Sequence, residues 1–197
     1  MRIGIYCGSF DPPHLGHLIL PCYAIEKFNL DKIIYVPSAK SVNKSYHFAN
    51  SQDRYNMLSL LIKNNPLLCI EKYEIEKDSK TYTFETLSYL KDKYKIEKNN
   101  SFLCIGSDWI DDLENWKNFE IIRSLVNFII FKRSPYINDI EKKMEKINIR
   151  KDEYLILDKQ IDISSTEIRK LIEKQETYSY LLSESVYKYI IEKGLYQ

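Results

Sequence analysis

Short apolar runs alternate along the chain with longer stretches in which apolar residues recur at helical spacing. The runs contain many β-branched and aromatic residues, which suits buried strands. They cover residues 1–7, 32–37, 67–75, 102–106, 126–131 and 153–158. The amphipathic stretches predict helices over residues 51–65, 84–98, 116–125, 137–147, 166–174 and 184–193. Alternating strands and helices predict an α/β fold with a doubly wound parallel sheet.

The whole chain, residues 1–197, is expected to form one domain, because 197 residues with 44% hydrophobic content suffice for one well-buried core. Residues 160–197 would be its C-terminal helical part, with Gly194 as the C-cap of the last helix. In such a sheet, ligands bind beyond the carboxyl ends of the strands at the topological switch point. The first strand ends at Cys7, so the residues that follow it are candidates for a binding site.

The segment after this strand, GSFDPPHLGH at residues 8–17, joins a glycine turn to two histidines three positions apart. Its two prolines suit a first helical turn, so we expect the helix to begin near Pro13 or His14 and to continue past a kink at Pro21. Residues three apart share a helix face, which places His14 and His17 together at the positive end of the helix dipole.

An anion is expected to dock at this helix start. The dipole contributes only about 0.3–1 kcal/mol at an exposed site, so the imidazoles and cationic side chains must supply the rest. Gly8 and Gly16 are expected to let a ligand approach the backbone closely. An HxxH pair alone is more often structural, but the ten-residue motif as a whole favours the handling of phosphate.

A histidine pair can also hold a metal ion. The chain has four cysteines without paired spacing and no HExxH sequence near the histidines, so we expect no zinc site. The cysteines are Cys7, Cys22, Cys69 and Cys104. Unpaired cysteines indicate reduced thiols, and we expect a cytoplasmic protein without a leader peptide or a membrane span.

A second candidate motif is ISSTEIR at residues 163–169. Ser164, Ser165 and Thr166 form a hydroxyl-rich turn that can cap the helix after it. Arg169 then projects back toward whatever the start of that helix binds. Taken alone, this pattern is equally consistent with a purely structural cap.

The two motifs together carry a resemblance. HLGH at residues 14–17 resembles the HxGH motif of the nucleotidyltransferase superfamily, and ISSTEIR resembles the ISSTxIR signature of bacterial nicotinate mononucleotide adenylyltransferases. TYTFETL at 81–87 and GSDWIDDLENWK at 106–117 are similar to the YTxxTL and GxD…LxxW segments of that family. VPSAKSVNK at 36–44 is similar to its VPxxxPPHK loop but loses the prolines and histidine to Ser41, Val42 and Asn43.

The resemblance extends from Gly4 to Tyr196 and implies a Rossmann-like nucleotidyltransferase fold. It implies catalytic roles for His14, His17 and Arg169. It implies that ATP is bound by Gly8, Ser9, Phe10, His14, His17, Gly106, Asp108, Ile163, Ser165, Thr166 and Arg169. It implies that the acceptor is bound by Lys44, Tyr82, Thr83, Asp108, Trp116 and Arg133.

Several of these residues also have a structural interpretation. Trp116 can stack on a pyridine ring or simply pack in the core. Thr83 can be an N-cap whose neighbouring N–H groups face a carboxylate. Asp108 can accept hydrogen bonds from ribose hydroxyls or cap the next helix. Arg133 and Lys44 can bind phosphate or be solvated charges at strand ends.

The implied reaction is adenylyl transfer from ATP to nicotinate mononucleotide, which yields nicotinate adenine dinucleotide and pyrophosphate in NAD biosynthesis. The acceptor phosphate is already an anion, so catalysis should consist of in-line positioning and stabilisation of developing charge. Mg²⁺ would be carried by the ATP phosphates and need no metal site of the protein.

Two classes of alternative remain. The first is a sister transferase, either a phosphopantetheine adenylyltransferase or a cytidylyltransferase with the same two-histidine site. The second is a sensor that binds the dinucleotide without turnover. The net charge of +1 gives no indication of a nucleic-acid partner, so we expect small-molecule substrates, no membrane partner and, as one possibility, a homo-oligomer.

Overall fold

The computed structural model describes residues 1–40, 47–135 and 138–197. Six parallel strands form one sheet in the order β3-β2-β1-β4-β5-β6. They are β1 (Ile3–Gly8), β2 (Lys32–Pro37), β3 (Leu68–Ile70), β4 (Ser101–Gly106), β5 (Asn127–Phe131) and β6 (Tyr154–Leu157). The predicted doubly wound parallel sheet is confirmed. The chain builds outward from β1 to β3 and returns to the centre at β4, so the switch point lies between β1 and β4.

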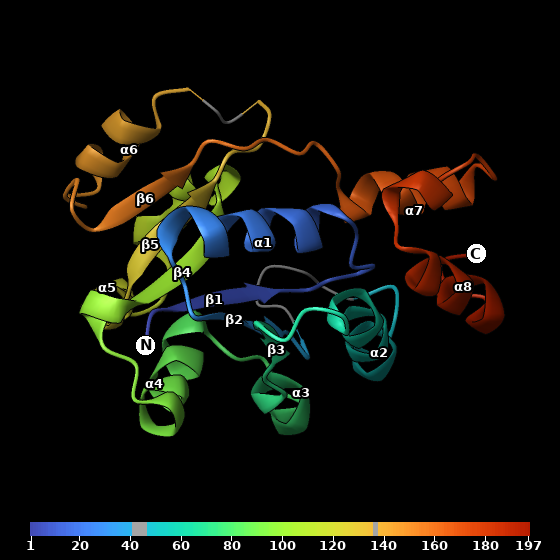
Figure 1. Cartoon of the computed structure of the whole chain (residues 1–197), viewed down its shortest axis with the longest axis horizontal. Coiled ribbons are helices and arrows are strands. Elements are labelled where there is room, and N and C mark those ends of the chain that lie inside the picture. Colours follow the sequence, from blue (N-terminus) through green and yellow to red (C-terminus); the bar gives the residue numbers. More distant parts are fainter. Residues whose placement is uncertain (41–46, 136–137) are drawn as a thin grey trace.

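Eight α-helices of the described residues connect and cover these strands (Figure 1). They are α1 (Gly16–Phe28), α2 (Ser51–Ile62), α3 (Tyr73–Lys77), α4 (Thr83–Tyr94), α5 (Phe119–Leu125), α6 (Ile140–Lys146), α7 (Ser165–Glu173) and α8 (Glu184–Lys193). Three 3₁₀ segments, η1 (Lys98–Asn100), η2 (Ser107–Asn115) and η3 (Ser179–Leu181), complete the chain. Figure 1 shows α7 and α8 at the end of the sheet toward which β1 points, beside α2.

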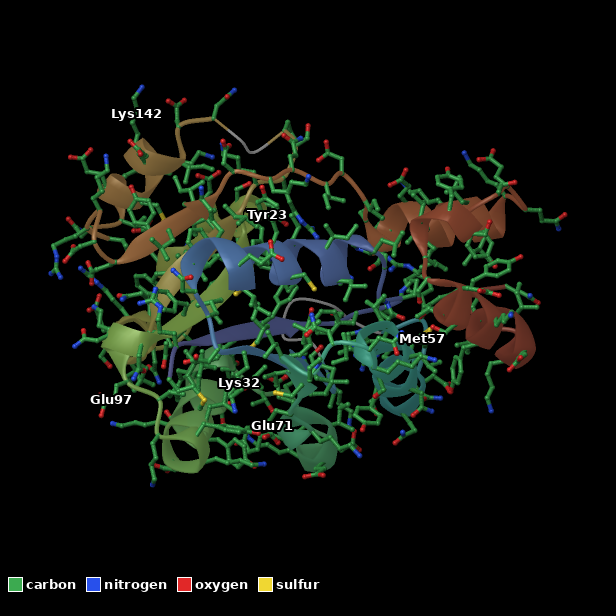
Figure 2. All side chains as sticks on the ribbon, in the orientation of Figure 1. Tyr23, Lys32, Met57, Glu71, Glu97 and Lys142 are labelled. Carbon is green, nitrogen blue, oxygen red and sulfur yellow. The ribbon has the colours of Figure 1, made fainter. Side chains whose placement is uncertain are left out.

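The alternating strand residues form two apolar layers, one on each face of the sheet. Tyr6 and Tyr35 belong to the layer that packs α1, α2, α7 and α8, whereas Ile5 and Ile34 belong to the layer that packs α4, α5 and α6. Full burial of one such side chain stabilises the fold by about 1.5–3 kcal/mol. Met57 of α2 is completely buried, while Lys142 extends into solvent from α6 (Figure 2).

The strand predicted over residues 67–75 was wrong beyond Ile70. The backbone turns there, and Tyr73–Lys77 forms the short helix α3. Glu71 explains the change, because its carboxylate accepts a hydrogen bond from the Tyr73 backbone N–H (3.2 Å). The same carboxylate is held by Tyr94 and Lys93 of α4, each at 2.8 Å. These long-range contacts override the strand-like run of the sequence.

Several helix ends also differ from the prediction. The first helix begins at Gly16 rather than at Pro13 or His14, and it continues through Pro21 to Phe28. The helix predicted over 84–98 ends at Tyr94, because Lys95 adopts a left-handed conformation. The helix predicted over 116–125 begins only at Phe119, after the left-handed Asn118. Among the residues that the structure describes, no helix is long and apolar enough to cross a membrane.

Candidate functional site

A cavity of about 650 Å³ lies at the switch point, beyond the carboxyl ends of β1 and β4. Its walls come from these strands, α3, η2 and the starts of α4 and α7. Most residues predicted for the site meet here. Those that line the cavity are Gly8, Ser9, Phe10, His14, His17, Tyr82, Thr83, Gly106, Asp108, Trp116, Arg133, Ser165 and Thr166. Lys44 and the altered loop Ser41–Asn43 lie outside the described residues.

Two groups of side chains in the lining are each held together by their own contacts. We call the first the histidine end; it consists of Gly8–Phe10, His14, His17 and Ser164–Thr166. We call the second the aromatic end; it consists of Thr81–Thr83, Trp109, Trp116 and Lys117. Asp108 and Arg133 belong to neither group and lie at the ends of β4 and β5.

His14 is buried at the histidine end, with only 1% of its surface exposed. Neither of its ring nitrogens has a hydrogen-bond partner among the described residues. Burial, and then the positive charge of Arg133, lower the pKa of His14 to about 3. The imidazole is therefore neutral at physiological pH and carries one N–H donor, which is ready for an oxygen atom in the cavity.

His17 stacks on His14, with ring centroids 3.7 Å apart. Its Nδ1 atom accepts a hydrogen bond from the backbone N–H of His14 (3.2 Å). In neutral His17 the ring hydrogen must then be on Nε2, so this nitrogen is a donor. Tyr35 of β2 fixes the backbone by donating its hydroxyl to the His17 carbonyl (2.7 Å). The motif thus presents two imidazoles as neighbouring donors in the cavity wall.

The glycine in the HLGH motif makes room for a side chain of the protein, and the expected close approach of a ligand to the backbone stays a prediction. A Cβ atom on Gly16 would lie 3.1 Å from the His14 ring. Gly8 likewise faces the ring of Phe10, at 3.0 Å for such a Cβ atom. Phe10 itself has a positive φ of 50° and is buried. The tight turn is therefore filled from within by its own residues.

Arg54 of α2 holds this turn through a hydrogen bond to its backbone, although the sequence analysis did not predict Arg54 as a site residue. Its guanidinium is fully buried and donates to the carbonyl groups of Ser9 (2.6 Å), Ala39 (3.1 Å) and Ala49 (3.2 Å). Arg54 occurs in an amphipathic stretch, where an arginine reads as part of the solvated face. Its role depends on three backbone segments that meet around it. The local sequence pattern does not predict that meeting.

The second motif closes the histidine end from the other side. Ser164 is the N-cap of α7, and its side chain accepts a hydrogen bond from the Glu167 N–H (3.1 Å). Ser165 donates its hydroxyl to the carbonyl of Pro12 (2.8 Å). Arg169 donates to the carbonyl of Asp11 (2.5 Å). The predicted cap is confirmed, and the neighbouring side chains connect α7 to the histidine turn.

Two residues predicted to bind ATP do not line the cavity. Ile163 packs against the apolar layer that contains α1 and α7. Arg169 lies beside the cavity, where it contacts Thr166 (3.2 Å) and covers the ring of Phe48 (4.3 Å). Its guanidinium therefore supports the backbone of the turn, and a direct contact with ATP stays a prediction.

Asp108 sits in the first turn of η2 and does not cap that helix. Its Oδ1 atom is buried without a hydrogen-bond partner among the described residues, and its Oδ2 atom lies 3.7 Å from the Arg133 guanidinium. Gly106 permits this placement, since a Cβ atom there would lie 2.1 Å from Oδ1. The Ser107 hydroxyl accepts a hydrogen bond from the Arg133 N–H (2.9 Å). An acceptor oxygen and a cation thus stand side by side in the middle of the cavity.

The aromatic end joins η2 to the start of α4. Trp116 contacts Trp109 edge to face, with centroids 5.8 Å apart, and the Trp116 indole N–H has no acceptor among the described residues. Lys117 lies over the ring of Tyr82, 4.2 Å from its centroid. These contacts give this end of the cavity flat aromatic faces.

The sequence suggested Thr83 as the N-cap of α4, but the N-cap is Tyr82. Glu85 accepts a hydrogen bond from the Tyr82 N–H (2.9 Å), and Thr83 becomes the first helical residue. The first N–H groups of a helix have no partner within it. Those of Thr83 and Phe84 are therefore available to an anion at the aromatic end.

Glu74 of α3 also lines the cavity and was missed by the sequence analysis. It is 5% exposed and accepts a hydrogen bond from the Thr86 hydroxyl (2.6 Å). Burial raises the pKa of Glu74 to about 7. The sequence analysis predicted a strand over residues 67–75, and this prediction gave no reason to expect the Glu74 carboxyl near the site.

The four cysteines are free thiols, as expected. Within residues 1–40, 47–135 and 138–197, no three histidine, cysteine, aspartate or glutamate side chains gather as a metal site. The acidic and imidazole groups of the cavity are spread along its wall and do not converge on one point. This donor set fits a cation that arrives on a phosphate ligand better than one held by the protein alone.

Comparison with known proteins gives full-length matches. The sequence model of the cytidylyltransferase-like family matches residues 5–171. A probable nicotinate-nucleotide adenylyltransferase of Caldicellulosiruptor bescii is 34% identical over 100% of both chains. A second, from Lactiplantibacillus plantarum, is 36% identical over 100% of this chain and 88% of that protein. The solved nicotinic acid mononucleotide adenylyltransferase of Plasmodium falciparum, complexed with NaAD, is 25% identical with a TM-score of 0.79, covering 99% of this chain and 97% of that chain.

Proposed function

The chain belongs to the nicotinate-nucleotide adenylyltransferase family within the cytidylyltransferase-like superfamily. We propose that the cavity between β1 and β4 is its active site. The reaction transfers the adenylyl group of ATP to nicotinate mononucleotide and releases nicotinate adenine dinucleotide and pyrophosphate. The observation that carries the assignment is the stacked pair His14 and His17, which faces the same cavity as Ser165 and Thr166.

The histidine end suits the triphosphate. His14 is neutral, and His17 in its neutral form carries its hydrogen on Nε2, so each ring offers one N–H to phosphate oxygens. Thr166 at the start of α7 adds a hydroxyl group, while Ser165 donates its own hydroxyl to the Pro12 carbonyl and so holds the turn. The first N–H groups of that helix also favour an anion. These donors are fixed before the reaction, so they stabilise the charge that develops in the transition state without reorganisation.

The approach of ATP changes the electrostatic surroundings of His14. In the free protein, burial and Arg133 keep His14 neutral. Bound phosphates would counter that repulsion and raise the pKa of His14. The imidazoles act as donors throughout, and the chain needs neither a nucleophile nor a general base, because the attacking phosphate oxygen of the acceptor is already ionised.

The aromatic end suits the pyridine nucleotide. Trp116 offers a flat face for the ring, and the N–H groups of Thr83 and Phe84 would bind the nicotinate carboxylate. Asp108 would accept hydrogen bonds from ribose hydroxyls through its unpartnered Oδ1 atom. Arg133, next to it, would attract the phosphate between the two nucleosides. The attacking oxygen would then lie in the middle of the cavity, in line with the adenylyl phosphorus.

Mg²⁺ would be bound by the ATP phosphates and neutralise charge on the leaving pyrophosphate. The protein's share of this work is to hold the phosphate oxygens with the imidazole and hydroxyl donors of the histidine end. A homo-oligomer and a cytoplasmic location remain expectations from the sequence.

The test is pyrophosphate release from ATP and Mg²⁺ with nicotinate mononucleotide, nicotinamide mononucleotide and phosphopantetheine as parallel acceptors, together with CTP and glycerol 3-phosphate. We expect turnover with nicotinate mononucleotide to exceed that with every other acceptor. Faster turnover with phosphopantetheine or with CTP would assign a sister transferase. Binding of the dinucleotide without turnover of any substrate would assign a sensor.

A further inference from the structure

Asp11 lies in the histidine turn, three residues before His14, and is not among the residues that line the nucleotide cavity. The side chain is 3% exposed. It accepts hydrogen bonds from the backbone N–H groups of Phe48 (2.8 Å) and Ala49 (3.1 Å) and from the Tyr196 hydroxyl (2.8 Å). This carboxylate therefore joins the histidine turn to the residues before α2 and to those after α8.

The backbone of the same turn is held by the C-terminal part of the chain. Ser165 and Arg169 of α7 donate to the carbonyl groups of Pro12 and Asp11. Leu15, which precedes α1, donates its N–H to the carbonyl of Leu181 (3.0 Å). These contacts come from residues more than 150 positions away in the sequence. Tyr196 also belongs to the C-terminal part of the chain, and its hydroxyl donates to the Asp11 carboxylate.

We propose that Tyr196 is a positioning residue for adenylyl transfer, which acts through the Asp11 carboxylate to hold His14 at the histidine end of the cavity. The proposal rests on the function proposed above. A hydrogen bond to a buried carboxylate is among the stronger ones in proteins. Its loss would leave Asp11 with the backbone donors of Phe48 and Ala49 and the nearby His47 side chain, and it would allow the turn to move. Small displacements of a catalytic donor reduce turnover strongly, because the donor must meet the oxygen that gains charge in the transition state.

The electrostatic surroundings of Asp11 give the proposal a second readout. Burial would raise the pKa of this carboxyl, but the nearby His47 side chain and hydrogen bonds from Phe48, Tyr196 and Ala49 together hold it below its ordinary value. Arg54 of α2 and Arg169 of α7 are the nearby cationic groups, and His47 lies 3.7 Å from Oδ2. Removing the Tyr196 hydroxyl removes one of these donors, so the carboxyl would take up a proton at a higher pH.

Tyr189 provides a matched control. It belongs to α8, and its hydroxyl also donates to a carboxylate, that of Asp53 (2.7 Å), while it accepts from Asn56 (2.9 Å). These contacts join α8 to α2 and do not reach the histidine turn. Tyr189→Phe and Tyr196→Phe therefore remove the same group and the same kind of hydrogen bond from one part of the fold, but only the second change touches Asp11.

The experiment measures kcat, KM for ATP, KM for nicotinate mononucleotide and the melting temperature of the full-length chain and both variants. We expect Tyr196→Phe to lower kcat about tenfold, the effect of one hydrogen bond to a charged group, and to move the acid limb of the pH profile of kcat upward. Tyr189→Phe should melt earlier but keep the parent kcat and pH profile. Equal kcat losses in the two variants, or an unchanged kcat in Tyr196→Phe, would overturn the proposal.

A double-substitution cycle tests whether Tyr196 acts through Asp11. In an Asp11→Asn background, Tyr196→Phe should change kcat by less than about twofold, because the partner is already altered. A second tenfold loss in that background would show an independent role and reject the proposed route. Turnover of the parent chain in the same assay distinguishes this failure from failure of the proposed function itself.

Discussion

The two ends of the cavity are built in different ways. The histidine end is assembled from the turn after β1, from α2 and from segments more than 150 positions later, which meet through buried hydrogen bonds. The aromatic end comes from residues 81–83 and 109–117, which span a much shorter stretch of the sequence and contact each other through rings. Changes at the first end should therefore affect the fold and catalysis together, whereas changes at the second should affect mainly the choice of acceptor.

The strongest test of this difference is Arg54→Met. The substitution leaves the three carbonyl groups of Ser9, Ala39 and Ala49 without their buried donor. At about 1–3 kcal/mol for each unsatisfied group, the free energy of unfolding should fall by at least about 3 kcal/mol. Urea unfolding measures this change. Arg54→Lys keeps the charge but not the fork geometry, so it should recover only part of the loss; full recovery would mean that charge alone holds the turn.

The next effect is on turnover at the same end. Removing one preorganised donor costs about 2.7–4 kcal/mol, so His14→Ala and His17→Ala should each lower kcat about 10²–10³-fold. Steady-state kinetics with ATP and nicotinate mononucleotide measure the loss. Asn at either position keeps one N–H donor and should retain more turnover than Ala. Parent-like turnover of His17→Ala would contradict the role assigned to the pair.

A third effect, next to the aromatic end, is on the pH dependence of stability. Glu74 has a pKa of about 7 in the fold against 4.5 when unfolded. The folded chain therefore keeps a proton that the unfolded chain releases, and stability falls as pH rises from about 4.5 to 7. The loss is on the order of 3 kcal/mol, at 1.36 kcal/mol for each pKa unit. Glu74→Gln should remove this decline in unfolding curves recorded between pH 5 and 8.

Glu71, the neighbouring acid, gives a control of opposite sign. Burial would raise the pKa of Glu71, but hydrogen bonds from Lys93, Tyr94 and the Tyr73 N–H hold it below its ordinary value of 4.5. Its contribution to stability is therefore present above pH 4.5 and is lost as pH falls through the lowered pKa. Glu71→Gln should destabilise the chain at pH 8, where Glu74→Gln stabilises it. Changes of the same sign in both variants would contradict the assigned burial effects.

A smaller effect is expected for binding of the acceptor. Loss of an aromatic stacking partner costs about 1–3 kcal/mol, so Trp116→Ala should raise KM for nicotinate mononucleotide about tenfold or more. KM for ATP should change less than about twofold, because the histidine end is untouched. Trp116→Phe keeps a flat ring and should lie between the two. Equal increases in both KM values would show that the two ends are not separable in the way proposed.

The smallest effect compares two adjacent hydroxyl groups at the start of α7. Ser164 caps the helix, whereas Ser165 contacts the histidine turn. Ser164→Ala should cost about 1 kcal/mol of stability, which corresponds to a fall of about 2–4 °C in Tm for a chain of this size. Ser165→Ala should lower kcat/KM for ATP more than Ser164→Ala does. The reverse order in kinetics would place the phosphate contact on the cap.

The sequence predicted the sheet well because the strands β1, β2, β4, β5 and β6 are buried on both faces and read as continuous apolar runs. It was wrong beyond Ile70, where the carboxylate of Glu71 turns the backbone through contacts with α4. Residues within a motif, such as His14, His17 and Ser165, were predicted because their chemistry lies in their own spacing and neighbours.

Asp11, Arg54, Glu74 and Tyr196 were not predicted as parts of the site. Asp11 is inside the first motif, but its partners come from the residues just before α2 and from beyond α8. Arg54 and Glu74 are charged residues in stretches where charge normally faces solvent, and their burial follows only from the packing of distant elements. The hydrophobic pattern of the sequence cannot predict such residues, because their role depends on tertiary contacts.

The hydrogen bonds that join Ser165, Leu181 and Tyr196 to the histidine turn also bear on when the protein becomes active during its synthesis. The ribosome makes His14 early, but the groups that hold it are made between about 150 and 180 residues later. A nascent chain can form β1 and α1 before these groups exist, yet its histidine turn then lacks these contacts. Nucleotide turnover should therefore reach its full rate only when residue 196 has left the ribosome, so that incomplete chains consume little ATP.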